Sequence, residues 1–97
     1  MRFVQTISFT SSRIEEIQGL SEEFEREQGD RAPGYIRSWV LRDRDRENAY
    51  MISVEFESYE LAMENSARPE TDAFARKMSE LVDGPVTYVN YDLIGGD

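Results

Sequence analysis

The stretch that decides the fold is residues 54–78, VEFESYELAMENSARPETDAFARKM, where a strand pattern is followed by two helical patterns. Ser58 can cap a short first helix that ends at Asn65, because its side chain can accept a hydrogen bond from the first turn. Pro69 fits the first turn of a second helix. That second helix, predicted over 69–81, carries an apolar stripe at helical spacing: Phe74, Met78 and Leu81.

Outside this stretch, apolar and polar residues alternate with a period of two, which is typical of strands. The strands are predicted over four ranges: 2–9, 35–42, 49–57 and 86–93. A polar connector over 43–48 has the length of a hairpin loop. Between the first two strands, Ser12 and Glu15 have the spacing of a capping box at the start of a helix, and Gly29 ends that helix.

The predicted order of elements is β-α-β-β-α-β, with the second helical segment broken in two. This order is that of the split βαβ, or ferredoxin-like, arrangement. Right-handed crossovers place both helices on one face of a four-stranded antiparallel sheet. The sequence therefore predicts an α+β fold with a single domain over residues 1–94 and a loose tail over 95–97.

Composition excludes several classes of protein. The chain has 97 residues, a formal net charge of −9, no His and no Cys. The negative charge disfavours nucleic acid and anionic membrane surfaces as partners, and without Cys there is no thiolate metal site or disulfide scaffold. No segment has the length of a membrane span or a signal peptide. We therefore expect a cytoplasmic protein.

Both faces of the predicted sheet carry apolar side chains. Val4 opposes Phe3 and Ile7 on the first strand, and Tyr91 opposes Tyr88 on the last. Two helices can cover only one face, and a large exposed apolar patch usually marks an interface. A homodimer formed by sheet-to-sheet packing around a two-fold axis is the expected solution. The alternative is a sheet with one solvated face, which antiparallel sheets allow.

The layout resembles the dimeric α/β-barrel superfamily that includes the antibiotic biosynthesis monooxygenase (ABM) group. The resemblance is clearest over residues 54–78, which read as strand, short helix, break, and a helix with an aromatic residue, Phe74, inside it. It implies a dimeric barrel built from two ferredoxin-like subunits. It also implies a pocket for a small molecule between sheet and helices.

Two departures from that family limit the chemistry that the resemblance implies. Members that bind or degrade haem use a His near the helix break, where this chain reads Glu64-Asn65-Ser66-Ala67-Arg68. The tryptophan common at the end of the third strand is Phe56 here. Haem ligation by imidazole is therefore excluded and no cofactor is expected. Cofactor-free oxygenation of an electron-rich aromatic molecule, as in the polyketide-tailoring members, remains open.

The first candidate site is formed by Tyr35, Arg37 and Trp39, which the period of two places on one face of the second strand. Together they could form an aromatic wall with a cationic anchor for a planar, anionic ligand. The alternative is that the two aromatic residues belong to the core or to an interface. Arg37 would then pair with a nearby carboxylate.

The second candidate site is the helix break, where Asn65, Ser66 and Arg68 could offer free N–H groups and a positive helix end to an anion or enolate. The alternative is ordinary helix capping. Glu55 and Glu57 form a tight carboxylate pair, which we expect to be solvated. No metal site is predicted, because the Asp43-Arg44-Asp45 run lacks the later ligands of a calcium loop.

Two functions follow from these observations. The first is an ABM-like dimeric barrel that binds a small apolar or aromatic molecule and oxidises or rearranges it without a cofactor. Its pocket candidates are the two sites above: Tyr35, Arg37, Trp39, Asn65 and Arg68. The second is a non-catalytic dimeric module that senses a ligand or binds a partner. A deep pocket with convergent polar groups would favour the first, and a fully packed core would favour the second.

Overall fold

The computed structural model describes residues 1–96, so Asp97, the last residue of the predicted tail, lies outside the described residues. Seven elements follow one another: β1 (Phe3–Thr10), α1 (Ile14–Gln28), β2 (Tyr35–Arg42), β3 (Ala49–Phe56), α2 (Tyr59–Ser66), α3 (Pro69–Ser79) and β4 (Thr87–Asp92). The predicted order, with its broken second helical segment, is confirmed. The predicted boundaries lie within two residues of these, and those of β2 coincide with them.

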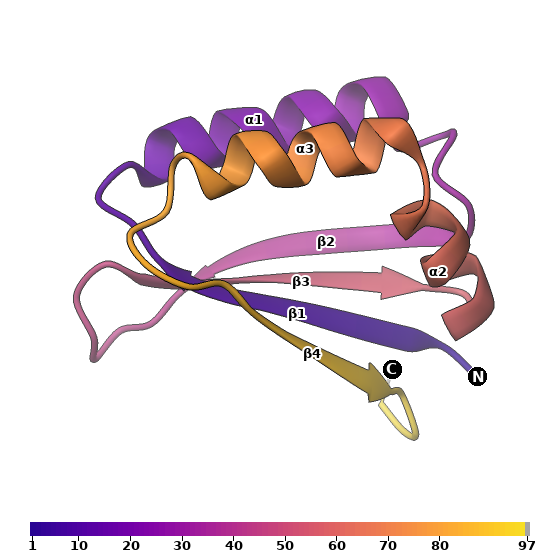
Figure 1. The fold of residues 1–97 in the computed structure, drawn as a ribbon. Helices are drawn as coiled ribbons and strands as arrows, with labels where there is room; N and C mark the ends of the chain where they lie inside the picture. Colours follow the sequence, from indigo (N-terminus) through magenta and orange to yellow (C-terminus); the bar gives the residue numbers. More distant parts are fainter. Residues whose placement is uncertain (97) are drawn as a thin grey trace.

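The four strands form one antiparallel sheet in the order β2-β3-β1-β4. Figure 1 shows α1 and α3 lying side by side over one face of this sheet, with α2 at one end. The ferredoxin-like α+β architecture is therefore confirmed. We call the sheet face under the helices the inner face, and the opposite one the outer face.

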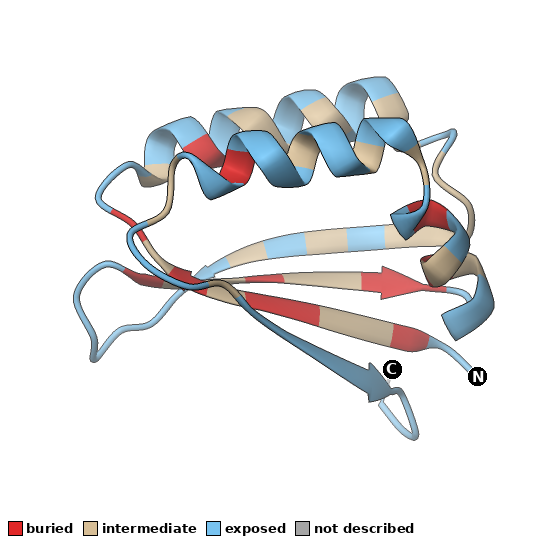
Figure 2. Cartoon of the chain, in the orientation of Figure 1, coloured by how far each residue is buried: buried red, intermediate tan, exposed pale blue. Residues whose placement is uncertain are grey.

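The register of the strands decides which side chains reach the core. Phe3 pairs with Phe56, and Ile7 pairs with Ile52, so all four lie on the inner face. The buried residues form two clusters. The larger one contains Ile7, Phe9, Ile17, Ile52 and Met78, and the smaller one contains Phe3, Phe56 and Ala62. Figure 2 shows this burial concentrated on the central strands, while β4 is exposed along its whole length.

A β-bulge in β2 overturns one prediction. The register of β2 against β3 shifts between Tyr35 and Arg37, so Tyr35 pairs with Phe56 whereas Arg37 pairs with Glu55. A bulge adds one residue to a strand, and the residues beyond it change sheet face. Tyr35 therefore lies on the inner face, and Arg37 and Trp39 lie on the outer face. The prediction that these three residues share one face is wrong.

The start of α1 also differs from the prediction. Arg13 occupies the N-cap position and makes no side-chain capping bond. Ser12 instead donates its backbone N–H to Asp83 Oδ2. The buried Ser11 hydroxyl accepts a hydrogen bond from Arg13 N at 2.9 Å and donates one to Leu81 O at 2.6 Å. The turn before α1 is thus held by a contact with the chain after α3, which local spacing does not reveal.

The outer face is not covered by any helix of the described chain and carries many apolar side chains. They come from all four strands and the residue after β4: Val4, Trp39, Leu41, Met51, Val89, Tyr91 and Leu93. Trp39 is 46% exposed and Tyr91 is 51% exposed. No helix within residues 1–96 is long and apolar enough to cross a membrane.

Candidate functional site

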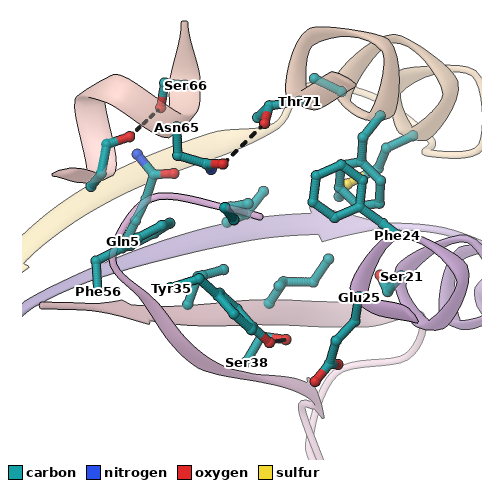
Figure 3. Close-up of a pocket in the computed structure, with 18 of the residues that line it drawn as sticks. Gln5, Ser21, Phe24, Glu25, Tyr35, Ser38, Phe56, Asn65, Ser66 and Thr71 are labelled. Atoms are coloured by element: carbon teal, nitrogen blue, oxygen red, sulfur yellow. Dashed lines mark hydrogen bonds between the residues drawn. The ribbon is translucent and has the colours of Figure 1, made fainter. Parts of the chain in front are cut away.

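A cavity of about 320 Å³ lies between the inner face and the three helices, and we call it the helix-side cavity. Strands β1, β2, β3 and β4 line its floor, and α1, α2 and α3 supply its walls. A volume of this size is in the range of small-molecule sites. Figure 3 shows polar side chains at separate places around the cavity, with apolar side chains between them.

The walls of the cavity are mainly apolar and include several aromatic rings. Phe24 of α1 and Phe74 of α3 face one another with ring centroids 4.8 Å apart. Tyr35 meets Phe56 edge to face at 6.3 Å. Phe24, Phe74 and Met78 lie on the cavity-facing sides of their helices, as the helical period of 3.6 residues predicts. Such walls suit a flat, apolar molecule.

One polar end of the cavity is formed by Tyr35, Ser38 and Glu25. The Tyr35 hydroxyl and the Ser38 hydroxyl share a hydrogen bond of 3.1 Å. Burial raises the pKa of Tyr35, the hydrogen bond with Ser38 opposes this rise, and the negative charge of Glu25 adds to it. The phenol is therefore protonated at neutral pH and can donate a hydrogen bond.

Ser21 of α1 contributes an unsatisfied hydroxyl to the cavity wall. Its Oγ atom is closed off from solvent and has no hydrogen-bond partner among residues 1–96. Buried polar groups are rarely left without a partner, since an unmade bond costs about 1–3 kcal/mol. Because the atom is closed off from the open part of the cavity as well, a bound molecule could supply the missing bond only after the Ser21 side chain rotates toward it.

The other polar end is formed by Asn65 and its neighbours at the junction of α2 and α3. Asn65 is 8% exposed, and its Oδ1 accepts a hydrogen bond of 3.2 Å from the Thr71 hydroxyl. This bond orients the carboxamide and leaves its NH₂ group as the donor for a bound molecule. The Ser66 hydroxyl donates to Ala62 O at 3.1 Å, which accords with ordinary bonding within a helix.

The side chain of Arg68 does not line the helix-side cavity, although Asn65, three residues earlier in the sequence, does. Arg68 Nη2 donates to Gln28 Oε1 at 2.8 Å, which ties the end of α1 to the start of α3. The same nitrogen lies 3.4 Å from Glu70 Oε2. Of the three residues predicted at the helix break, Asn65 and Ser66 therefore line the cavity and Arg68 does not.

Arg37 and Trp39 lie on the other side of the sheet from the cavity. The guanidinium carbon of Arg37 is 5.0 Å from the centroid of the Trp39 ring, which is a cation–π distance. Arg37 Nε also donates to Glu55 Oε1 at 3.2 Å. The structure thus has the alternative arrangement, in which Arg37 pairs with a carboxylate.

Glu55 was expected to be solvated, and this expectation is wrong. The residue is only 3% exposed, although it lies on the outer face. It is covered by two arginine side chains from neighbouring strands, Arg37 of β2 and Arg2 beside β1, whose Nη1 lies 2.9 Å from Glu55 Oε2. Charged groups lose less on burial when they are paired in this way.

Within residues 1–96, no three His, Cys, Asp or Glu residues come together as a group that could hold a metal ion. The polar groups around the helix-side cavity are hydroxyls, amides and two carboxylates, Glu25 and Asp72. This donor set suits hydrogen bonding to an organic molecule.

The geometry thus defines a ferredoxin-like α+β protein with a small-molecule cavity between sheet and helices. No protein-family model and no curated protein matches the sequence. Solved structures do match: SnoaB, a cofactor-independent oxygenase from Streptomyces nogalater, has a TM-score of 0.81 at 18% identity, over 98% of this chain and 95% of its own.

Two further structures of the same kind are similar to the chain. A candidate antibiotic biosynthesis monooxygenase from Caulobacter crescentus has a TM-score of 0.83 at 11% identity, over 97% of this chain and 91% of its own. Another from Nitrosomonas europaea has a TM-score of 0.73 at 15% identity, over 96% and 90%. At such identities the likeness shows the fold, and the ABM-like resemblance predicted from residues 54–78 is confirmed at that level.

Proposed function

We propose that this chain is an ABM-like protein that binds a small apolar or aromatic molecule in the helix-side cavity and oxidises it without a cofactor. The observation that carries the proposal is the cavity itself, because its apolar walls hold hydrogen-bonding groups at two ends. The description of SnoaB as a cofactor-independent oxygenase supports the reaction type. Function still depends on the site rather than on the fold.

The reaction would be a direct transfer of electrons from the substrate to O₂. An electron-rich aromatic ketone with an acidic C–H bond loses that proton to water, and its carbanion adds O₂ to form a C–O bond and a peroxide anion. The anion takes a proton back, and the hydroperoxide so formed loses water to leave a new ketone, so one atom of O₂ stays in the product and the other leaves as water. The NH₂ group of Asn65 would stabilise the negative oxygen of the intermediate.

The functional unit would be a homodimer that joins the outer faces of two subunits, each with a single domain over residues 1–94. The exposed apolar residues of the outer face support this part of the proposal. Trp39, stacked against Arg37, would then belong to the subunit interface. A dimer of this kind leaves the helix-side cavity of each subunit open to ligand, since the cavity lies on the inner face.

The test is O₂ uptake with 9-anthrone, whose central CH₂ group is acidic and whose product, anthraquinone, contains one atom from O₂. We expect uptake above the rate in buffer, with one O₂ consumed per anthraquinone formed. Asn65→Ala should lower the rate about a hundredfold, the usual effect of losing one oxyanion donor. Gln18→Ala, on the exposed surface of α1, should leave it unchanged.

Uptake no faster than in buffer would contradict the proposed reaction. If 9-anthrone nevertheless bound to the protein, the result would indicate the non-catalytic module instead. Mass spectrometry of the purified protein under non-denaturing conditions adds an independent measurement, because a tightly held small molecule would be seen as a discrete mass increment.

A further inference from the structure

Charge is distributed unevenly around the helix-side cavity. Its lining includes no Arg and no Lys from the described part of the chain, and it includes two carboxylates, those of Glu25 and Asp72. Asp72 is paired, since its Oδ2 lies 2.8 Å from Arg76 Nη2. Glu25 forms no ion pair with any residue from 1 to 96, so it is the one carboxylate of the lining whose charge is not compensated.

Glu25 lies at the rim of the cavity beside the Tyr35 hydroxyl, as Figure 3 shows. It lies one turn along from Ser21 on the same face of α1, and the buried Ser21 hydroxyl has no partner among residues 1–96. A ligand that reaches this end therefore meets a carboxylate that can only accept hydrogen bonds, together with hydroxyls that can accept or donate. Asn65 lies at a separate place in the same view, at the junction of α2 and α3.

We propose that Glu25 is a specificity-determining residue, by which the helix-side cavity accepts uncharged and cationic aromatic ligands and rejects carboxylate and phosphate ligands. This inference rests on the proposed function of the cavity. A ligand hydroxyl would donate to the Glu25 carboxylate. A ligand carboxylate would meet a like charge without any cation to balance it, in a region from which water is partly excluded.

The same charge leaves the proposed chemistry possible. The negative oxygen of the intermediate would form at the Asn65 end, away from Glu25. The substrate passes Glu25 at the rim of the cavity as a neutral molecule, and its negative charge develops only after it has bound. The inference also revises the expectation of an anionic ligand, because Arg37, the cation on which that expectation depended, lies on the outer face and is bonded to Glu55.

The experiment compares three probes of the same shape and different charge: 2-naphthalenemethanol, 2-naphthoate and 2-(aminomethyl)naphthalene. Their dissociation constants are measured by calorimetry at pH 7 and low salt. We expect the alcohol to bind about tenfold or more tightly than the carboxylate, since one uncompensated charge at close range changes affinity by at least this factor. The amine, being cationic, should bind at least as tightly as the alcohol. The preference should weaken with added salt, because Glu25 is exposed at the rim.

Glu25→Gln should reduce the preference for the alcohol over the carboxylate at least threefold. Glu23→Gln is the matched control, because it makes the same change of charge on the exposed surface of α1 outside the cavity lining. The inference is overturned if the carboxylate binds as tightly as the alcohol, or if the two substitutions act alike. In either case binding to the cavity, and with it the proposed function, would stand. If none of the three probes binds, the proposed function fails and the inference fails with it.

Discussion

Replacing Gly34 by alanine is expected to destabilise the protein strongly, because Gly34 leads into β2 with a φ of 68° and lies directly against α2. A Cβ atom at this position would be 2.6 Å from Leu61 Cβ and 2.9 Å from Leu61 Cδ1. The Cβ atom of Leu61 is fixed to the helix backbone and cannot rotate away. Helix α2, which carries Asn65 to the cavity, would therefore have to shift.

The magnitude follows from three contributions. A left-handed conformation costs a residue with a Cβ atom about 1–2 kcal/mol, and crowding in a packed region costs about 1–3 kcal/mol. The smaller conformational freedom of alanine in the unfolded chain returns about 0.4–1 kcal/mol. At the middle of these ranges the free energy of unfolding should fall by roughly 3 kcal/mol, which lowers Tm by about 12–24 °C for a chain of this length.

Urea unfolding followed by circular dichroism measures this change, and two other glycines provide controls. Gly84 has a φ of 101° and nothing within 4 Å of a built Cβ, so Gly84→Ala should show the backbone cost without crowding. Gly19 lies inside α1 with equally open space, so Gly19→Ala should stabilise the protein by about 0.5–1 kcal/mol. If Gly34→Ala costs no more than Gly84→Ala, the contact between Gly34 and α2 does not exist as described.

Three further outcomes are expected. Because burial and then Glu25 raise the pKa of Tyr35, its phenol should ionise above its ordinary value in an absorbance titration, and Glu25→Gln should lower that pKa. Since the folded pKa lies above the unfolded value of about 10, the associated stability is complete below that pH and is lost as pH rises further. A titration curve that Tyr35→Phe leaves unchanged above that pH would refute the assignment. Glu55→Gln should lower the free energy of unfolding by roughly 1–3 kcal/mol in urea, because the carboxylate pairs with two half-exposed arginines; an unchanged value would show that these pairs contribute nothing. Trp39→Glu should convert a dimer into a monomer in sedimentation, and a wild-type monomer at micromolar concentration would contradict the proposed interface.

The order of elements could be predicted because it depends on local periodicity. Alternation marked the strands, helical spacing marked the stripe of α3, and Pro69 marked its start. The strand order then follows from general rules for crossovers. An error of one or two residues in a boundary does not change the order of the elements. The ferredoxin-like arrangement could therefore be predicted from the sequence.

The faces of β2 could not be predicted, because they depend on one bulge. A period of two places Tyr35 with Arg37, whereas the register shift between them sends these two side chains to opposite faces. No local residue pattern in this strand indicates the extra residue of the bulge. The bulge changes the candidate site: in place of the predicted aromatic wall with a cationic anchor, the structure has a cavity in which Tyr35 has carboxylate and hydroxyl neighbours.

Glu55 and Glu25 show a second limit of the sequence. Glu55 is buried because arginines adjacent to it across the sheet cover it, and their adjacency is set by strand register over long separations. Glu25 reads as one of several glutamates on the polar side of α1, and only the position of the cavity distinguishes it from Glu23. Asn65 could be predicted as a candidate binding residue because the break between the two helices is visible in the sequence.

The central claim is that ligands enter the helix-side cavity rather than adhere to the apolar outer face. Methyl NMR of protein labelled at its methionine methyl groups tests it directly, because Met78 lines the cavity and Met51 lies on the outer face. With 2-naphthalenemethanol added, we predict a saturable shift of the Met78 methyl signal from the aromatic ring, while the Met51 signal stays in place. A shift of Met51 with Met78 unmoved would contradict the account.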